Sequence, residues 1–202
     1  MNSRNEILNS DCFPVKVCEF EINENQKKFQ IITEDGSVFS VPHLNRKNKK
    51  IGILGDSGCR NTKTQLCKNT NDWPLKFIVE KSLKEDVNLM IHLGDFRYSR
   101  VKCDEISCSD NFQNWLIEFF QPMFPLLKSV PFLFIRGNHE DCNSKGDAYF
   151  LFFFQKLLKD TPTCDEPNPD DFNFLDPWKI KLSNFNFFIL DSSYADDYPS
   201  GN

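Results

Sequence analysis

Ile51-Gly-Ile-Leu-Gly-Asp56-Ser-Gly58, Leu89-Met-Ile-His-Leu-Gly-Asp95-Phe-Arg-Tyr98 and Phe132-Leu-Phe-Ile-Arg-Gly-Asn138-His-Glu140 are the three stretches that decide the fold. In each, an apolar run ends at glycine and is followed by polar side chains that suit a metal site. The stretches are spaced by about one strand–helix–strand unit. Such units set parallel strands side by side, so their carboxyl ends meet at one sheet edge, where α/β proteins form sites. The pattern predicts an α/β fold with a metal site there.

Further strands are expected nearer the two ends of the chain. Residues 28–33 and 37–41 flank Glu34-Asp35-Gly36, which is a turn signal, and together they predict an antiparallel β-hairpin. The apolar run 185–190 predicts another buried strand.

Three helices are expected between the strands. One covers 72–84 and is capped by its first residue. A second opens near Asp110, carries an amphipathic stripe that predicts core packing, and is disrupted at Pro122 and Pro125. A third covers 146–159.

Size and composition limit the classes of function. A chain of 202 residues suits one compact unit. We expect residues 1–48 to form an N-terminal extension with the hairpin and residues 49–202 to form the α/β domain. A net charge of −5 argues against a broad nucleic-acid-binding surface. No apolar run approaches the roughly 20 residues that a membrane span needs.

Eight cysteines fall into pairs that are local in sequence, and none has the CxxC spacing of a zinc ribbon or a thioredoxin-like site. Two interpretations stay open: disulfides that staple polar loops, or eight cytosolic thiols. The pair formed by Cys12 and Cys18 favours neither interpretation. Disulfides are the favoured interpretation for three pairs, namely Cys59 with Cys67, Cys103 with Cys108, and Cys142 with Cys164.

The location of the protein is left open by two observations. The cysteine pattern indicates a periplasmic or secreted protein, because disulfides need an oxidising compartment. Met1–Ser10 has no apolar stretch of the kind that marks a signal peptide. Either the protein is cytosolic, or the chain as given lacks its natural beginning.

The three motifs together resemble those of the calcineurin-like metallophosphoesterase superfamily. They are most similar to its purple-acid-phosphatase-like branch and to a group of Cys-containing bacterial relatives. The resemblance covers roughly residues 50–192. It implies a partial metallophosphoesterase-type sandwich, with a parallel-rich β-sheet and flanking helices. It also implies a metal-dependent phosphoesterase whose partner is a small phosphorylated substrate.

The resemblance implies a role for each residue at the strand ends. Asp56 is similar to the aspartate that binds one metal, and Asp95 is similar to the aspartate that bridges two. Asn138 is similar to the amide ligand of the second metal. His139 is similar to the catalytic histidine that contacts phosphate and protonates the leaving group.

Tyr98 indicates which metals are implied. Many members have Asp-x-His in the first motif, where this chain has Asp56-Ser-Gly58, but Gly-Asp-x-x-Tyr places Tyr98 where the purple-phosphatase branch has a tyrosinate. A phenolate favours Fe(III), so the implied cofactors are two metal ions, Fe(III) and a divalent Fe, Zn or Mn ion. Such a pair lowers the pKa of a bridging water and stabilises in-line displacement at phosphorus.

Other charged residues near the motifs are less specific. Glu140 is expected to support the ligands rather than bind metal. Arg136 is interpreted either as a phosphate contact or as an ion pair beside the carboxylates, without preference. Arg60 and Arg97 are undecided in the same way.

The histidines do not complete the superfamily pattern. That pattern has three further histidine ligands, and this sequence contains only His43, His92 and His139. His92 lies inside a predicted strand and is expected in the core. We therefore expect a C-terminally truncated chain. The alternatives are an inactive or degenerate member that lacks the C-terminal histidine ligands, and a disulfide-stapled binding module.

Overall fold

The computed structural model describes residues 2–3, 12–20, 29–42, 50–60, 62–63, 65–67, 69, 71–98, 110–142, 146–154, 164, 175–182 and 185–193. Their central element is a three-stranded sheet in the order β5-β6-β7. Both pairings are parallel, with Ile51 opposite Leu89 and Met90 opposite Phe132. The predicted α/β fold with parallel strands is therefore confirmed. These strands are β5 Ile51–Leu54, β6 Leu89–His92 and β7 Phe132–Phe134.

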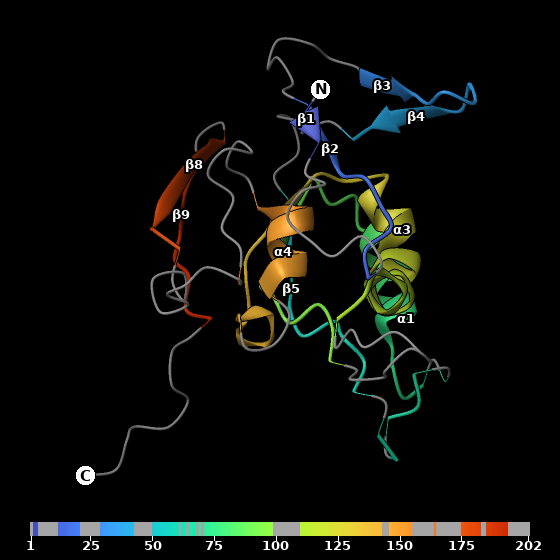
Figure 1. The fold of residues 1–202 in the computed structure, drawn as a ribbon, viewed down its shortest axis with the longest axis vertical. Coiled ribbons are helices and arrows are strands. Elements are labelled where there is room, and N and C mark those ends of the chain that lie inside the picture. The colour runs from blue at the N-terminus through green and yellow to red at the C-terminus, as the bar shows by residue number, and fades with distance from the viewer. Residues whose placement is uncertain are drawn as a thin grey trace.

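Helical segments follow each of these strands. After β5 comes one helix, after β6 comes a long helix in three parts, and after β7 come a short 3₁₀ turn and a further helix (Figure 1). The segments are α1 Leu75–Lys84, α2 Phe112–Trp115, the π-helical turn Leu116–Phe120, α3 Gln121–Leu127, the 3₁₀ turn Asn138–Glu140 and α4 Gly146–Phe153.

The sheet separates two apolar clusters, because alternate residues of a strand point to opposite faces. On one face, Met90 joins the larger cluster with helical residues such as Trp115 and Phe119. On the other face, Leu89 and Ile91 pack with residues of an antiparallel hairpin, β8 Trp178–Leu182 and β9 Phe185–Ile189.

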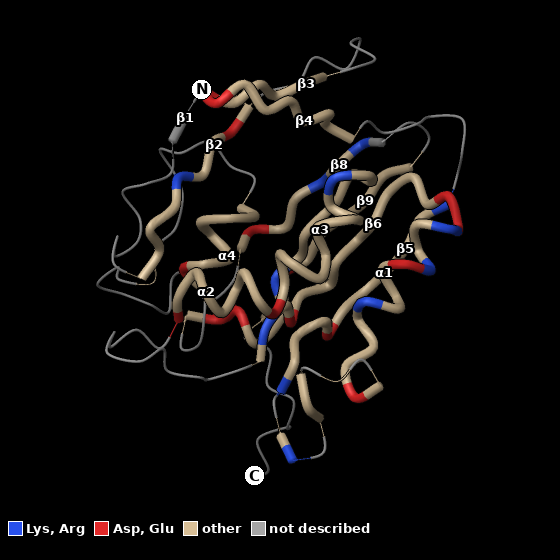
Figure 2. Tube along the Cα trace, turned by 90° about the vertical axis from the view of Figure 1, so that its right-hand side faces the viewer, with Lys and Arg blue, Asp and Glu red and all other residues tan. Residues whose placement is uncertain are grey.

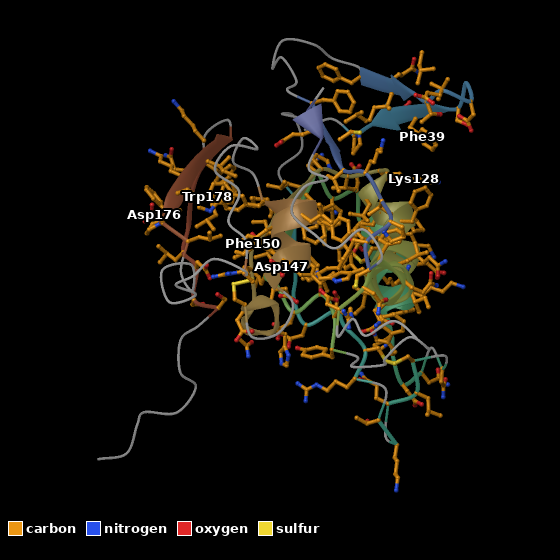
Figure 3. The ribbon with its side chains drawn as sticks, viewed as in Figure 1. Phe39, Lys128, Asp147, Phe150, Asp176 and Trp178 are labelled. Atoms are coloured by element: carbon orange, nitrogen blue, oxygen red, sulfur yellow. A yellow bond between two sulfur atoms is a disulfide. The ribbon has the colours of Figure 1, made fainter. Side chains whose placement is uncertain are left out.

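The figures show the sheet and the elements packed on its two faces from the side. In Figure 1 the β8–β9 hairpin lies on the left, α1 and α3 lie on the right, and β5 and α4 lie between them. Figure 3 labels Phe150 on α4, which belongs to the larger cluster, and Trp178 on β8, which packs against the smaller one.

The N-terminal hairpin is confirmed. β3 Phe29–Ile32 and β4 Val38–Val41 pair antiparallel around the predicted Asp-Gly turn, where Gly36 takes a φ of 81°. Both views place this hairpin at one end of the molecule (Figures 1 and 2). Two further short strands, β1 Asn2–Ser3 and β2 Cys18–Glu19, pair with each other and were not expected from the sequence.

The predicted start of the first helix was wrong. Asp72 is not its N-cap, because α1 begins at Leu75 and Pro74 precedes it. The Asp72 carboxylate instead accepts hydrogen bonds from the backbone of Leu66 (3.4 Å) and from the Asn69 amide (3.1 Å). Asp72 therefore stabilises the preceding loop by these hydrogen bonds and does not cap α1.

The prediction that Pro122 and Pro125 disrupt the second helix was also wrong. α2, the π-helical turn and α3 follow one another without a gap, and both prolines lie inside α3. A proline ring normally clashes with the carbonyl four residues earlier. The wider π turn, in which the Gln121 N–H bonds the Leu116 carbonyl, lets Pro122 follow.

Three further differences concern the C-terminal part. α4 ends at Phe153, and the rest of the helix expected at 146–159 lies beyond Phe154, outside the described residues. β8 was not expected at all. β9 buries one face only, because Ile189 is buried while Phe188 is 72% exposed.

Two of the three favoured disulfides are confirmed. Cys59 is bonded to Cys67, and their Cα atoms are 5.7 Å apart. Cys142 is bonded to Cys164, and their Cα atoms are 5.2 Å apart. The first bond closes the loop after β5, and the second joins the start of α4 to a residue further along the chain.

The other cysteines do not add a confirmed pair. Cys103 and Cys108 both lie outside the described residues, as does His43, so a disulfide between Cys103 and Cys108 stays a prediction. Cys12 is disulfide-bonded and Cys18 is an exposed free thiol. Cys12 and Cys18 are therefore not bonded to each other.

Basic and acidic residues are both spread along the described segments of the chain, as Figure 2 shows. Among the helices that the structure describes, none combines the length and the apolarity that crossing a membrane requires.

The larger apolar cluster predicts a strong effect of truncation at Phe119. This ring is fully buried and packs edge-on against His92 and Phe96. Phe119→Ala should lower the free energy of unfolding by about 3–5 kcal/mol, because it leaves a cavity in the core. Phe77→Ala on α1 is the matched control, since Phe77 is 58% exposed, and it should cost less than about 0.5 kcal/mol. Urea denaturation measures both, and equal losses would contradict the assignment of the core.

Candidate metal centre

The predicted site residues follow the strands at the carboxyl edge of the sheet. Asp56 follows β5 and Asp95 follows β6, and the backbone hydrogen bonding between these strands continues into the loops. The Asp56 N–H donates to the Gly94 carbonyl (3.2 Å), and the Gly58 N–H donates to the Asp95 carbonyl (3.1 Å). The two loops therefore run side by side past the strand ends.

One phenol connects the two aspartates. The Tyr98 hydroxyl lies 2.5 Å from Oδ1 of Asp56 and 2.6 Å from Oδ2 of Asp95. A tyrosine carries a single O–H proton, so it cannot donate to both carboxylates at once. Burial raises the pKa of Tyr98, and its hydrogen bonds to Asp56 and Asp95 raise it further. Three oxygen atoms, two from carboxylates and one from the phenol, thus lie around a single phenolic proton.

The third motif meets this cluster through Asp95. The His139 backbone N–H donates to Oδ1 of Asp95 (3.1 Å), and the half-buried His139 ring packs edge-on against Tyr98, with centroids 4.5 Å apart. Asn138 is the exposed residue just before His139. The structure thus brings Asp56, Asp95, Tyr98 and His139 together and places Asn138 beside them.

Both aspartates have unusual backbone conformations. Asp56 and Asp95 have φ values of 51° and 56°, in the left-handed region that few non-glycine residues adopt. Gly94 has a φ of 96°, and a Cβ atom there would collide with the backbone of Gly137. Such strain persists only where the surroundings hold it, and it concentrates at functional sites.

Glu140 is the residue that holds this backbone. Its carboxylate is fully buried and accepts hydrogen bonds from the N–H groups of Asp95 (2.7 Å), Phe96 (3.0 Å) and Gly137 (3.1 Å). Burial and the charge of Asp95 raise the pKa of Glu140 to about 7, although these N–H donors favour the charged form. Both oxygens are engaged with backbone, which agrees with a supporting role.

A second buried network fixes the backbone of Tyr98. Glu118, in the π-helical turn, accepts a hydrogen bond from the Tyr98 N–H (3.2 Å), and its other oxygen lies 3.7 Å from Nε of Arg97. The fully buried Arg97 also pairs with Asp110, which accepts from the Trp115 indole (3.0 Å). Arg97 is therefore a structural ion-pair residue.

Sequence reasoning did not find Glu118 or assign Asp110 a role. Neither residue lies in a strand-end motif, and helical spacing alone gives no reason to connect Glu118 with the loop after β6. The remaining signal is a single acid that interrupts an apolar run, directly before Phe119 and Phe120 in the sequence. Such a residue needs a buried partner.

His92 lies in the core, as expected. Nδ1 of its fully buried ring accepts from the Gly94 N–H (3.2 Å), which leaves Nε2 to donate to Oγ of Ser57 (2.8 Å). Burial lowers the pKa of His92 to about 3. With both nitrogens engaged and Phe96 stacked on its face, His92 is not positioned to bind metal.

Arg136 forms an ion pair in the structure, with Asp191 as its partner. Its buried guanidinium lies 2.5 Å from Oδ2 of Asp191 and over the ring of Phe150. Asp191 also accepts from the N–H groups of Leu175 (2.8 Å) and Ser193 (2.9 Å). This pair fastens the end of β9 to the end of β7 rather than facing the site.

The donor set at the strand ends fits a hard cation. Within the described part of the chain, no three His, Cys, Asp or Glu side chains gather as a metal site. The convergent donors are two carboxylates and a phenol, which are oxygen ligands of the kind that hard ions prefer. The Tyr98 hydroxyl lies within hydrogen-bonding distance of both carboxylates, so the three oxygens are close enough to contact one ion together.

A search of curated proteins gives no match. Among solved structures, the chain is similar to the purple acid phosphatase PPD1 isolated from yellow lupin (Lupinus luteus) seeds. The two are 16% identical with a TM-score of 0.43, and the match covers 84% of this chain and 31% of that one. The chain thus spans under a third of the length of that protein.

The sequence also matches a family model. The model describes calcineurin-like phosphoesterases, and it matches residues 49–199. This range contains all three strand-end motifs and most of the chain. The chain therefore belongs to the calcineurin-like phosphoesterase family.

Proposed function

We propose that this protein is a metal-dependent phosphoesterase that hydrolyses small phosphate esters at the strand-end site. Asp56 and Tyr98 would bind one metal, Asp95 would bridge two, and Asn138 would bind the second. The observation that carries the proposal is the convergence of three oxygens on a single phenolic proton. Bound metals would supply Lewis-acid activation of water and of the phosphoryl group.

The protein's own residues would then perform three tasks. Asp56 and Asp95, held in the left-handed conformation, aim their carboxylates at one point. Glu140 and Glu118 fix the backbone beneath Asp95 and Tyr98. His139, at the edge of the Tyr98 ring, would contact the phosphate and donate a ring proton to the leaving oxygen.

Tyr98 also supports an assignment of the two metals. A phenol among the ligands favours Fe(III) beside a divalent Fe, Zn or Mn ion, and a purple-acid-phosphatase-like site.

We also propose that the phosphoesterase domain covers residues 49–202 and that residues 1–48 are an N-terminal extension.

A second candidate is an inactive family member. One observation favours it: of the two histidines that the structure describes, His139 lies at the site and His92 is buried in the core with both nitrogens engaged. Metal affinity depends on the number and geometry of ligands. Oxygen donors without imidazoles would hold two metals poorly.

Removal of one carboxylate charge tests the metal site. Asp95→Asn should weaken Mn²⁺ binding by at least about 10-fold, because an amide replaces the proposed bridging anion. Asp86→Asn is the matched control, since Asp86 is exposed, also has a positive φ (52°) and ends the α1 region rather than lining the site. Calorimetric titration with Mn²⁺ measures both. Equal affinities for the two variants would contradict the assignment.

Tyr98→Phe tests the proposed phenolate ligand. The wild-type protein loaded with Fe(III) should absorb visible light through tyrosinate-to-iron charge transfer, and the variant should lose this band while it keeps its fold. Visible and far-ultraviolet spectra of the two proteins measure this. A band that survives in Tyr98→Phe would show that another group colours the metal.

The two candidate functions differ in what the 202-residue chain can do alone. We expect it to bind transition metals weakly and to hydrolyse para-nitrophenyl phosphate slowly or not at all, because His139 is the one imidazole at the site among the described residues. Metal content after dialysis and the rate of phosphate release measure these properties. Two retained metals with rapid turnover would contradict this expectation and exclude the inactive alternative.

A further inference from the structure

Three arginines come shortly after the strands of the central sheet: Arg60 after β5, Arg97 after β6 and Arg136 after β7. They differ in how far they are buried. Arg97 is fully buried against Asp110 and Glu118, and Arg136 is buried against Asp191. Arg60 is exposed. A group that meets an incoming anion must reach solvent, so Arg60 is the member of this set that can do so.

The guanidinium of Arg60 lies at the mouth of the site. Its Cζ atom is 4.7 Å from the centre of the Tyr98 ring, and the hydroxyl of that ring contacts both Asp56 and Asp95. The same ring also makes a T-shaped contact with His139. Arg60 and His139 therefore both pack against Tyr98 beside the proposed reaction centre.

The backbone that carries Arg60 is held on several sides. Cys59 is fully buried and bonded to Cys67, and the Arg60 N–H donates to Oε1 of Gln65 (2.8 Å). The Trp73 indole donates to the carbonyl of Ser57 (2.9 Å). The loop thus fixes the main chain of Arg60 and leaves its side chain at the surface.

We propose that Arg60 binds the phosphate group of the substrate at the mouth of the site. The inference rests on the proposed function, since it assigns a contact to the same substrate. A guanidinium presents a planar fork of N–H donors that matches two phosphate oxygens. The face of Tyr98 holds this fork while the site is empty of substrate, and the disulfide-closed loop sets its position.

The alternative is an ordinary surface contact between a cation and an aromatic ring, which stabilises folded proteins modestly. Such a contact would affect stability but not anion affinity. The two roles therefore separate in a binding measurement.

The test is calorimetric titration of inorganic phosphate into the 202-residue protein in saturating Mn²⁺. Arg60→Gln should bind phosphate about tenfold more weakly, since it removes a charge-assisted hydrogen bond. Arg60→Lys should restore part of the affinity through its charge. Lys63→Gln is the matched control, because Lys63 is exposed in the same loop, and it should bind phosphate as the wild type does. Mn²⁺ affinity should be the same in all four proteins.

Each other outcome overturns the inference. Equal phosphate affinity in wild type and Arg60→Gln rejects the contact and leaves the proposed function intact. An equal loss in Lys63→Gln assigns the effect to loop charge in general. A loss of Mn²⁺ affinity in Arg60→Gln assigns Arg60 to the structure of the metal site. A wild-type protein that binds Mn²⁺ but no phosphate rejects both the inference and the proposed function.

Discussion

The geometry of the site depends on one buried carboxylate that ties together two loops. Glu140 follows β7, and it accepts hydrogen bonds from Asp95 and Phe96 after β6 and from Gly137 in its own turn. Without it, the buried Phe96 N–H and the partly buried N–H groups of Asp95 and Gly137 would lose their acceptor, at a cost of up to about 1–3 kcal/mol each. The left-handed conformation of Asp95 would also lose its support. Asp95 can therefore direct its carboxylate toward the Tyr98 hydroxyl, because Glu140, forty-five positions later in the chain, holds the Asp95 backbone.

The phenol is fixed by a separate device. Glu118 reaches the Tyr98 N–H from a π-helical turn, and such turns often occur at functional positions. The same turn allows Pro122 to stay within the helix, so one departure from regular α geometry serves both the fold and the site. Arg97 balances the charge of Glu118, since a buried carboxylate without a partner would be costly.

The sequence predicted what depends on local pattern. The hairpin around Gly36, the parallel strands that end at Asp56 and Asp95, and the Cys59–Cys67 staple all follow from turn residues, apolar runs and spacing. It did not predict β8, although alternating Trp178-Lys-Ile-Lys-Leu182 carries the period-2 pattern of a half-buried strand, because only the continuous apolar run 185–190 was interpreted as a strand there. The supporting role of Glu140 was expected, but its partners and those of Glu118 lie in distant segments of the chain. Spacing within one element cannot reveal such contacts.

The acids near the strand ends divide into two kinds according to what surrounds them. Glu140 and Glu118 face backbone N–H donors, so their oxygens are already satisfied and they hold structure. Asp56 and Asp95 face each other across one phenol, where acceptors outnumber protons. Because Asp56 is exposed, a cation can reach these oxygens from solvent, whereas the fully buried Glu140 is engaged with backbone. Burial and donor count, rather than residue type, therefore separate the proposed metal ligands from the acids that position them.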